Sequence, residues 1–148
     1  MDSIRQRIMV QVDTRFKTIK IGFGFKTDLG LHVNWWRDME KNPFQPTELP
    51  GVNLIDDVEN VEHDSTAKDF HTMPIKIEIA STLAEEMRKA IADIEAAMHI
   101  DRTWDHLASH TRLLSNESDV RHEGQKYLGT RVVMEVQYFT RIGDPFST

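Results

Sequence analysis

One segment near the middle of the chain constrains the fold most, because it changes from a strand pattern to a helix pattern within a few residues. Residues 72–80 alternate apolar residues with others, which is the period of a strand with one buried face. Over residues 82–100, apolar residues then recur every three or four positions, as in an amphipathic helix (Leu83, Met87, Ile91, Ile94, Met98). Thr82 and Glu85 have the spacing of a capping box. We therefore predict a strand that leads directly into a capped helix.

A second helix is predicted at the N-terminus. Its apolar stripe consists of Ile4, Ile8, Val12, Phe16 and Ile19. Ser3 and Gln6 offer a capping box at its start, and Gly22 can end it.

The other alternating segments predict strands. They are residues 31–36, residues 51–56 with a continuation through Val58 and Val61, residues 111–115, and residues 131–142, whose two partly apolar faces suggest a central position. Residues 38–50, with three prolines, and residues 116–129 are predicted loops. Pro74 cannot donate to a ladder, so it is expected at a strand start, a bulge or an edge.

The order of these segments predicts the fold class. We expect one α+β domain over residues 1–143, followed by a short tail over residues 144–148. Its sheet is mostly antiparallel, and the N-terminal helix and the central helix pack on it.

Charge is distributed unevenly along the chain, whose formal net charge is −6. Residues 1–26 hold six Lys or Arg and two acids, whereas residues 38–69 hold nine acids and two Lys. The acidic region cannot grip nucleic acid, because phosphate contacts need cations. It is either a solvated edge or a surface that repels polyanions or meets a basic partner.

Two classes of site are disfavoured by composition. There is no Cys, so disulfides and thiolate metal sites are excluded, which suits a reducing cytoplasm. No apolar run approaches the roughly 20 residues that span a bilayer, so no membrane contact is expected.

Catalytic patterns are sparse. The sequence has no G-x-S-x-G elbow, and the glycines of residues 22–26 lack the spacing of a phosphate-binding loop. On a continuous helix, His99, His106 and His110 would share one face and could ligate zinc. The alternative is that they are surface histidines near a helix end. We expect a protein that is not an enzyme and needs no cofactor, with a small metal-dependent enzyme at these histidines as the alternative.

Aromatic residues suggest contact with a partner. In the run Trp35-Trp36-Arg37, adjacent strand residues point to opposite faces, so one Trp enters the core and the other faces outward. An outward Trp beside Arg is typical of an interface hot spot. Phe44 and Phe146, isolated among polar and proline residues, are similar candidates. Alternatively, all of these side chains fold back onto the core.

The series of segments resembles the tail terminator proteins of long-tailed bacteriophages and the related neck proteins at the head–tail junction. The resemblance rests on Ile4-Arg5-Gln6-Arg7-Ile8, Trp35-Trp36-Arg37, Glu48-Leu49-Pro50-Gly51-Val52, the strand Ile75–Ile79, the helix Leu83–Met98 and the closing strand Val132–Tyr138. It covers most of the chain, without an invariant signature. Residues 101–129 and Pro74 depart from the pattern.

The resemblance implies a structural virion protein, assembled in the host cytoplasm and located at the head–tail junction. It implies a homohexameric ring that caps the completed tail tube, ends its polymerisation and joins the tail to the head connector. The implied partners are further copies of the chain, the tail tube protein and a connector or neck protein, while DNA passes through the lumen without specific binding. Another neck or tail-completion protein of the same fold is the nearest alternative.

A ring with heterologous contacts joins one patch of a subunit to a different patch of its neighbour. We expect the basic N-terminal helix to supply one patch, with Arg5, Arg7 and Lys17. Asp56 and Asp57 of the acidic region would supply the other.

Overall fold

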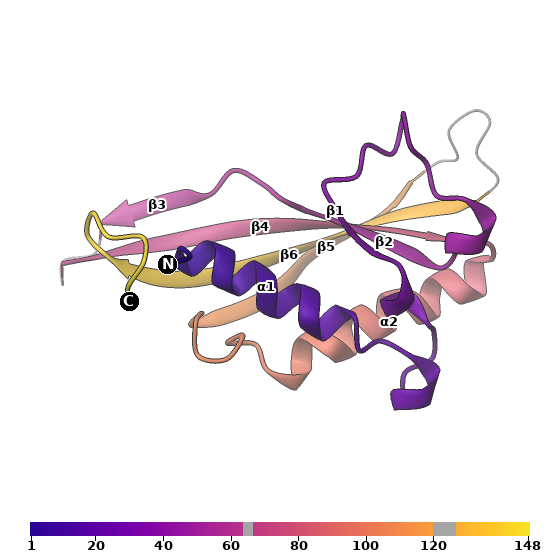
Figure 1. The fold of residues 1–148 in the computed structure, drawn as a ribbon, viewed down its shortest axis with the longest axis horizontal. Coiled ribbons are helices and arrows are strands. Elements are labelled where there is room, and N and C mark those ends of the chain that lie inside the picture. Colours follow the sequence, from indigo (N-terminus) through magenta and orange to yellow (C-terminus); the bar gives the residue numbers. More distant parts are fainter. Residues whose placement is uncertain (64–66, 120–126) are drawn as a thin grey trace.

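The computed structural model describes residues 1–63, 67–119 and 127–148, and within them the chain forms two α-helices and a six-stranded sheet (Figure 1). The elements are α1 (Ile4–Phe16), β1 (Val33–Trp35), β2 (Gly51–Asp56), β3 (Asn60–His63), β4 (Lys68–Ser81), α2 (Ala84–Ile100), β5 (His110–Asp119) and β6 (Leu128–Arg141). Short 3₁₀ turns lie at Ile21–Phe23, Leu29–Leu31 and Pro46–Glu48. The predicted α+β class is confirmed.

The sheet is built around two long strands. Its order is β1-β2-β4-β6-β5, with β3 also beside β4. Only β1 and β2 pair in parallel among the described strands; all other pairs are antiparallel. β4 and β6 have 14 residues each and pair along their whole length. Because β6 lies between β4 and β5, its predicted central position is confirmed.

One face of the sheet forms the core with both helices. Alternate residues of β4 and β6 point to this face and are buried (Ile75, Ile77, Ile79, Val132, Met134, Val136). They pack against the buried stripes of α1 (Ile4, Ile8, Val12, Phe16) and α2 (Met87, Ala90, Ile94, Ala97, Met98). The hydrophobic effect therefore orders this layer, as the two helical stripes predict.

The ends of the helices differ in part from the prediction. Ser3 does cap α1, because its hydroxyl accepts from the Gln6 N–H at 3.1 Å. α1 ends at Phe16 and not near Gly22, since the Ile19 N–H bonds to the Phe16 carbonyl in a tighter turn. The predicted capping box at the start of α2 is wrong: Leu83 is the N-cap residue, is exposed, and gives no side-chain cap.

Several strand ends also differ. β1 is shorter than the predicted 31–36, and β5 runs on from the predicted 111–115 into the predicted 116–129 loop, of which residues 120–126 lie outside the described residues. The strand at 51–56 ends at Asp56, so its predicted continuation through Val58 and Val61 is wrong.

A bulge separates β2 from β3, which lie one after the other along the same side of β4. Three residues, 57–59, face only two residues of β4, Met73 and Pro74. The Pro74 carbonyl accepts from the Asp57 N–H at 2.8 Å, so Pro74 faces the bulge. The N–H that proline lacks would have pointed to the same side, where the regular ladder is interrupted. The predicted bulge position is therefore confirmed, although β4 is an interior strand.

The sheet extends past the helices at one end (Figure 1). We call this extension the arm; it consists of β3, residues 68–72 of β4 and residues 137–141 of β6, and the rest of the fold is the body. The C-terminal segment folds back at the base of the arm, where the Ile4 N–H donates to the Pro145 carbonyl at 2.9 Å. Another bond, from the Arg141 N–H to the Ser147 carbonyl, closes this turn.

Candidate partner-binding surfaces

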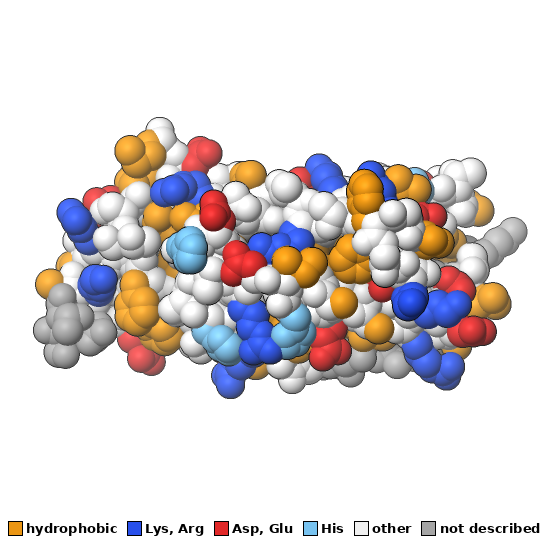
Figure 2. Space-filling view, turned by 90° about the horizontal axis from the view of Figure 1, so that it is seen from below, with side chains coloured by type: hydrophobic (Ala, Val, Ile, Leu, Met, Phe, Trp, Pro, Cys, Tyr) orange, Lys and Arg blue, Asp and Glu red, His pale blue; other side chains and the backbone are white. Residues whose placement is uncertain are grey.

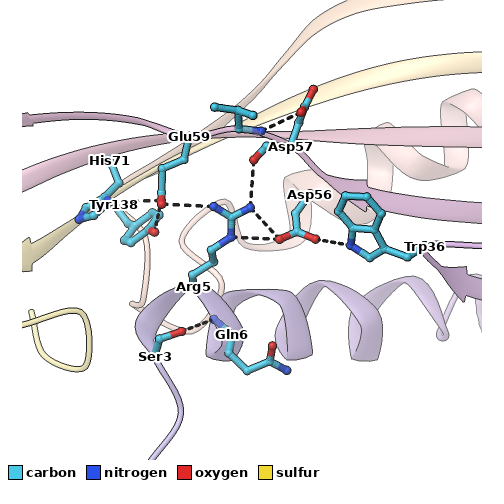
Figure 3. A network of polar contacts seen from close by, with 10 residues as sticks. Ser3, Arg5, Gln6, Trp36, Asp56, Asp57, Glu59, His71 and Tyr138 are labelled. Atoms are coloured by element: carbon cyan, nitrogen blue, oxygen red, sulfur yellow. Dashed lines mark hydrogen bonds and ion pairs between the residues drawn. The ribbon is translucent and has the colours of Figure 1, made fainter.

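Arg5 fastens α1 to the end of β2 (Figure 3). Its Nη2 and Nε donate to the Asp56 carboxylate at 2.7 and 3.0 Å, and its Nη1 donates to Glu59 at 3.2 Å. Nη2 also donates to the Asp57 carbonyl. Burial alone would raise the pKa of Asp56, but hydrogen bonds from Arg5 and Trp36 outweigh it and lower this pKa. The planar guanidinium thus holds the bulge against the helix.

Glu59 connects this cluster to the arm. Its carboxylate accepts from the Tyr138 hydroxyl and lies 3.2 Å from Nδ1 of His71. The His71 ring stacks on the Tyr138 ring at 4.5 Å, and its Nε2 lies 2.7 Å from the Thr140 hydroxyl. Burial and the adjacent Glu59 raise the pKa of Tyr138, so its hydroxyl stays protonated and donates. The network therefore ties the base of the arm to α1 and β2.

A groove of about 470 Å³ runs between α1 and the segment around Trp36. It is lined by Ser3, Arg5, Gln6, Met9, Val10, Asp13, Lys17, Trp35, Trp36 and Asp56. The ion pairs Lys17–Asp13 and Arg5–Asp56 balance its charges. An apolar segment of a partner would therefore meet no unpaired charge of the described lining residues.

The two tryptophans divide as predicted, one toward the core and one outward. Trp35 packs against the core, and its indole N–H donates to Asp13 at 2.7 Å. Trp36 is 63% exposed, and its indole N–H donates to Asp56 at 2.7 Å. Its φ of 52° turns the chain immediately after β1. Trp36 is consequently a fixed aromatic side chain on the surface.

Arg5, predicted to pair with acidic residues of a neighbouring subunit, has acidic partners in its own chain, Asp56 and Glu59. Lys17 likewise pairs with Asp13, and Asp57 pairs with Lys76 at 2.9 Å. A partner within the chain is bound without the loss of translational freedom that association costs. Arg7 is the exception: it is exposed and has no ion pair among the residues that the structure describes.

Arg37 and Phe44 organise the proline-rich loop from inside. Arg37 donates to the Glu48 carboxylate at 2.6 and 3.0 Å and stacks over the Phe44 ring at 4.6 Å. The hydrogen bond from Arg37 is the main reason that the pKa of Glu48 falls to about 2. Phe44 is buried against Tyr127, whereas Phe146 is exposed on the C-terminal segment. Of these two phenylalanines, Phe146 is the one that offers its ring to a partner.

The three histidines do not share a helical face. α2 ends at Ile100, so His99, His106 and His110 lie on α2, in the following turn and on β5. Arg102 donates to the His99 ring at 3.0 Å. Within residues 1–63, 67–119 and 127–148, no group of three or more His, Asp or Glu side chains could hold a metal ion.

The turn after α2 contains the longest run of positive φ angles at non-glycine residues in the described chain. Three successive residues, 104–106, have φ between 50° and 63°, a region that side chains other than glycine rarely adopt. Asp101 fixes the turn by accepting from the N–H and hydroxyl of Thr103 and from the Asp105 N–H. These bonds, led by the Thr103 hydroxyl, lower the pKa of Asp101 to about 2. The buried Trp104 ring, under the Arg15 guanidinium at 4.2 Å, anchors it.

The arm carries apolar side chains on both of its faces. Val61, beside His71, is on the face that the helices cover in the body, and it is exposed here. Phe70 and Phe139 pair on the opposite face with ring centroids 5.0 Å apart. With Glu62 and His63, they line a hollow of about 330 Å³. Sequence periodicity missed the β3 side of this surface, because an exposed strand does not need alternation.

Comparisons with known families and curated proteins identify no relative of this chain. No model of a known protein family matches the sequence, and no curated protein matches it either. Neither helix of the described chain is both long and apolar enough to cross a bilayer. Residues 64–66 of the acidic region lie outside the described residues. The features that point to function are therefore the surfaces themselves: the groove, the exposed Trp36 and the two-sided arm.

Proposed function

We propose that this protein is a structural component of a phage tail, a ring that caps the completed tail tube and joins it to the head connector. The order of elements supports this proposal. The N-terminal helix, the aromatic segment, β2, the long strand β4, α2 and the closing strand β6 occur in the order on which the resemblance rests. The proposed action needs no reacting group, because binding alone stops the growth of a tube.

The observation that carries the proposal is the apolar surface on both faces of the arm. A sheet normally buries at least one face against another layer, and here Val61 is 51% exposed on one face while Phe70 and Phe139 are only half-buried on the other. Apolar surface that the fold leaves accessible can mark contacts between proteins. A second copy of the chain or a tube subunit would supply the missing layer.

Charge is compatible with a channel for DNA. The net charge of −6 gives a ring an excess of carboxylates. Since phosphate contacts depend on free cations, such a ring would not retain DNA that passes through it.

The proposal is tested by native mass spectrometry and negative-stain imaging of the purified protein, alone and mixed with the tail tube protein of its phage. We expect six-fold rings and rings at tube ends, with tubes that no longer grow. A protein that stays monomeric in both samples would contradict the proposal. Rings that bind the head connector and leave tube growth unchanged would favour the alternative neck protein.

A further inference from the structure

We propose that neighbouring copies associate by placing a rigid apolar turn, residues 20–26, of one copy into the Phe70–Phe139 hollow on the arm of the next. We call residues 20–26 the knob. This inference rests on the proposed ring and specifies how its subunits bind one another.

The knob presents two large apolar side chains to solvent. It contains the 3₁₀ turn Ile21–Phe23, in which Ile21 is 60% and Phe23 67% exposed. Apart from chain neighbours, no atom lies within 4 Å of where a side chain at Gly22 or Gly24 would begin. The turn therefore stands clear of the body.

The knob is nevertheless held rigidly. At its base the carboxylate of Asp93, which is almost fully buried, accepts from the Lys26 N–H at 3.0 Å and the Thr27 N–H at 2.8 Å. The Ile21 N–H donates to Asp28 at 2.9 Å, and Phe25 packs against the core. A segment fixed in this way loses little conformational entropy on binding.

The hollow offers complementary chemistry. Its floor is the aromatic pair Phe70 and Phe139, and its rim carries Glu62 and His63. His63 is bonded to Asp69, whereas the Glu62 carboxylate has no partner among the described residues.

The knob carries matching cations. Lys20 lies 5.5 Å from the Phe23 ring, and neither Lys20 nor Lys26 has a carboxylate partner among the residues described. An aromatic side chain flanked by lysines suits an aromatic floor beside a free carboxylate.

The positions of the two surfaces determine the type of contact. The arm forms one end of the long axis in Figure 1, whereas the knob (dark violet) projects from the helix side of the body, away from the arm. Figure 2 shows hydrophobic side chains at several places along the face that it presents, interspersed with charged ones. Because the knob cannot reach the arm of its own chain, the contact joins two copies. The proposed contact is heterologous, with the knob of each copy bound by a different neighbour, and repeating it generates a closed ring or a filament.

A charge exchange tests the pairing by sedimentation and native mass spectrometry. We expect Glu62→Lys or Lys20→Glu alone to weaken association at least about tenfold, and the double variant to recover much of it. Lys41→Glu, at an exposed lysine in the proline-rich loop, is the matched control and leaves association unchanged. Single variants that form rings with wild-type affinity would overturn the inference.

A mixing experiment tests the heterologous geometry. Phe23→Asp removes the knob and Phe70→Asp removes the hollow, so each variant alone is monomeric. Mixed, they form a 1:1 heterodimer and nothing larger, because each pair has one intact knob and one intact hollow. A mixture that remains monomeric contradicts the inference, and circular dichroism of each variant checks that it is folded.

The outcomes separate this inference from the proposed function. If wild-type rings cap tubes and all four variants behave like wild type, the knob contact is wrong and the tail function stands. If the wild-type protein is monomeric even with the tube protein, both are overturned.

Discussion

β2 and β3 run along the same side of the same strand, yet they differ completely in burial. The first four residues of β2 are buried, while all four residues of β3 are exposed. Both pair antiparallel with β4, so backbone hydrogen bonding does not distinguish them. What differs is the layer beneath, since the core side chains of the helices pack under β2, and β3 lies in the arm. Covering by helices, more than strand pairing, therefore sets the stability of each part of this sheet.

Hydrogen exchange should show the largest difference between these strands. We expect amides of β3 to exchange at least about a thousandfold faster than those of β2, a difference of about 4 kcal/mol in opening free energy. Local opening exposes β3, whereas β2 opens only when the core does. Exchange is measured by NMR or mass spectrometry on the isolated subunit. Equal protection of the two strands would contradict the prediction.

Truncating one apolar side chain in each region should repeat the contrast. Ile77 is fully buried in the body, so Ile77→Ala should cost about 2–5 kcal/mol of unfolding free energy. Val61→Ala, in the arm, should change it by about 0.5 kcal/mol or less. Urea denaturation of isolated subunits measures both. Equal losses would mean that the arm has a core of its own.

The junction between body and arm depends on Arg5. Arg5→Met should lower the free energy of unfolding by about 1–3 kcal/mol, because the partly buried carboxylates of Asp56 and Glu59 lose their cation. Arg7→Met, on the exposed side of the same helix, is the matched control and should cost about 0.5 kcal/mol or less. If both variants unfold at the same urea concentration, the network does not stabilise the junction.

Lowering the pH should reduce the free energy of unfolding by a smaller amount, through Asp101 in the turn after α2. The pKa of Asp101 is about 2 in the folded protein and near its ordinary value of 3.8 when unfolded. Because the folded value is the lower one, its contribution is complete above pH 4 and is lost as the pH falls from about 4 to about 2.

Asp101→Asn should remove this pH-dependent contribution and cost about 1 kcal/mol at pH 7, since one acceptor oxygen is replaced by a donor. Thermal unfolding measured between pH 2 and pH 7 checks the prediction. An unchanged slope in the variant would assign the acid sensitivity to other carboxylates, such as Glu48.

Sequence periodicity predicted the helices and strands that bury one row of apolar side chains, and it missed strand residues outside the core. The helix pattern from Met87 to Met98 and the strand pattern at 75–79 follow burial directly, so periodicity located both. Residues 68–71 carry no such pattern, because they are exposed or half-buried, and these first four residues of β4 were not predicted. Composition also suggested that Arg5 meets acids, but it could not specify whether those acids belong to the same chain.

The bulge opposite Pro74 has a consequence for which side chains the arm displays. In β2 the even-numbered residues, such as Leu54, point toward the helices, whereas in β3 the odd-numbered Val61 points that way. The single extra residue between the strands reverses the parity. If the same residues continued the regular pairing of β2 without the bulge, Glu62 would turn away from the hollow, and Val61 and His63 would go to the opposite face. The chemistry of this surface thus depends on the number of residues in a short connection as much as on their identity.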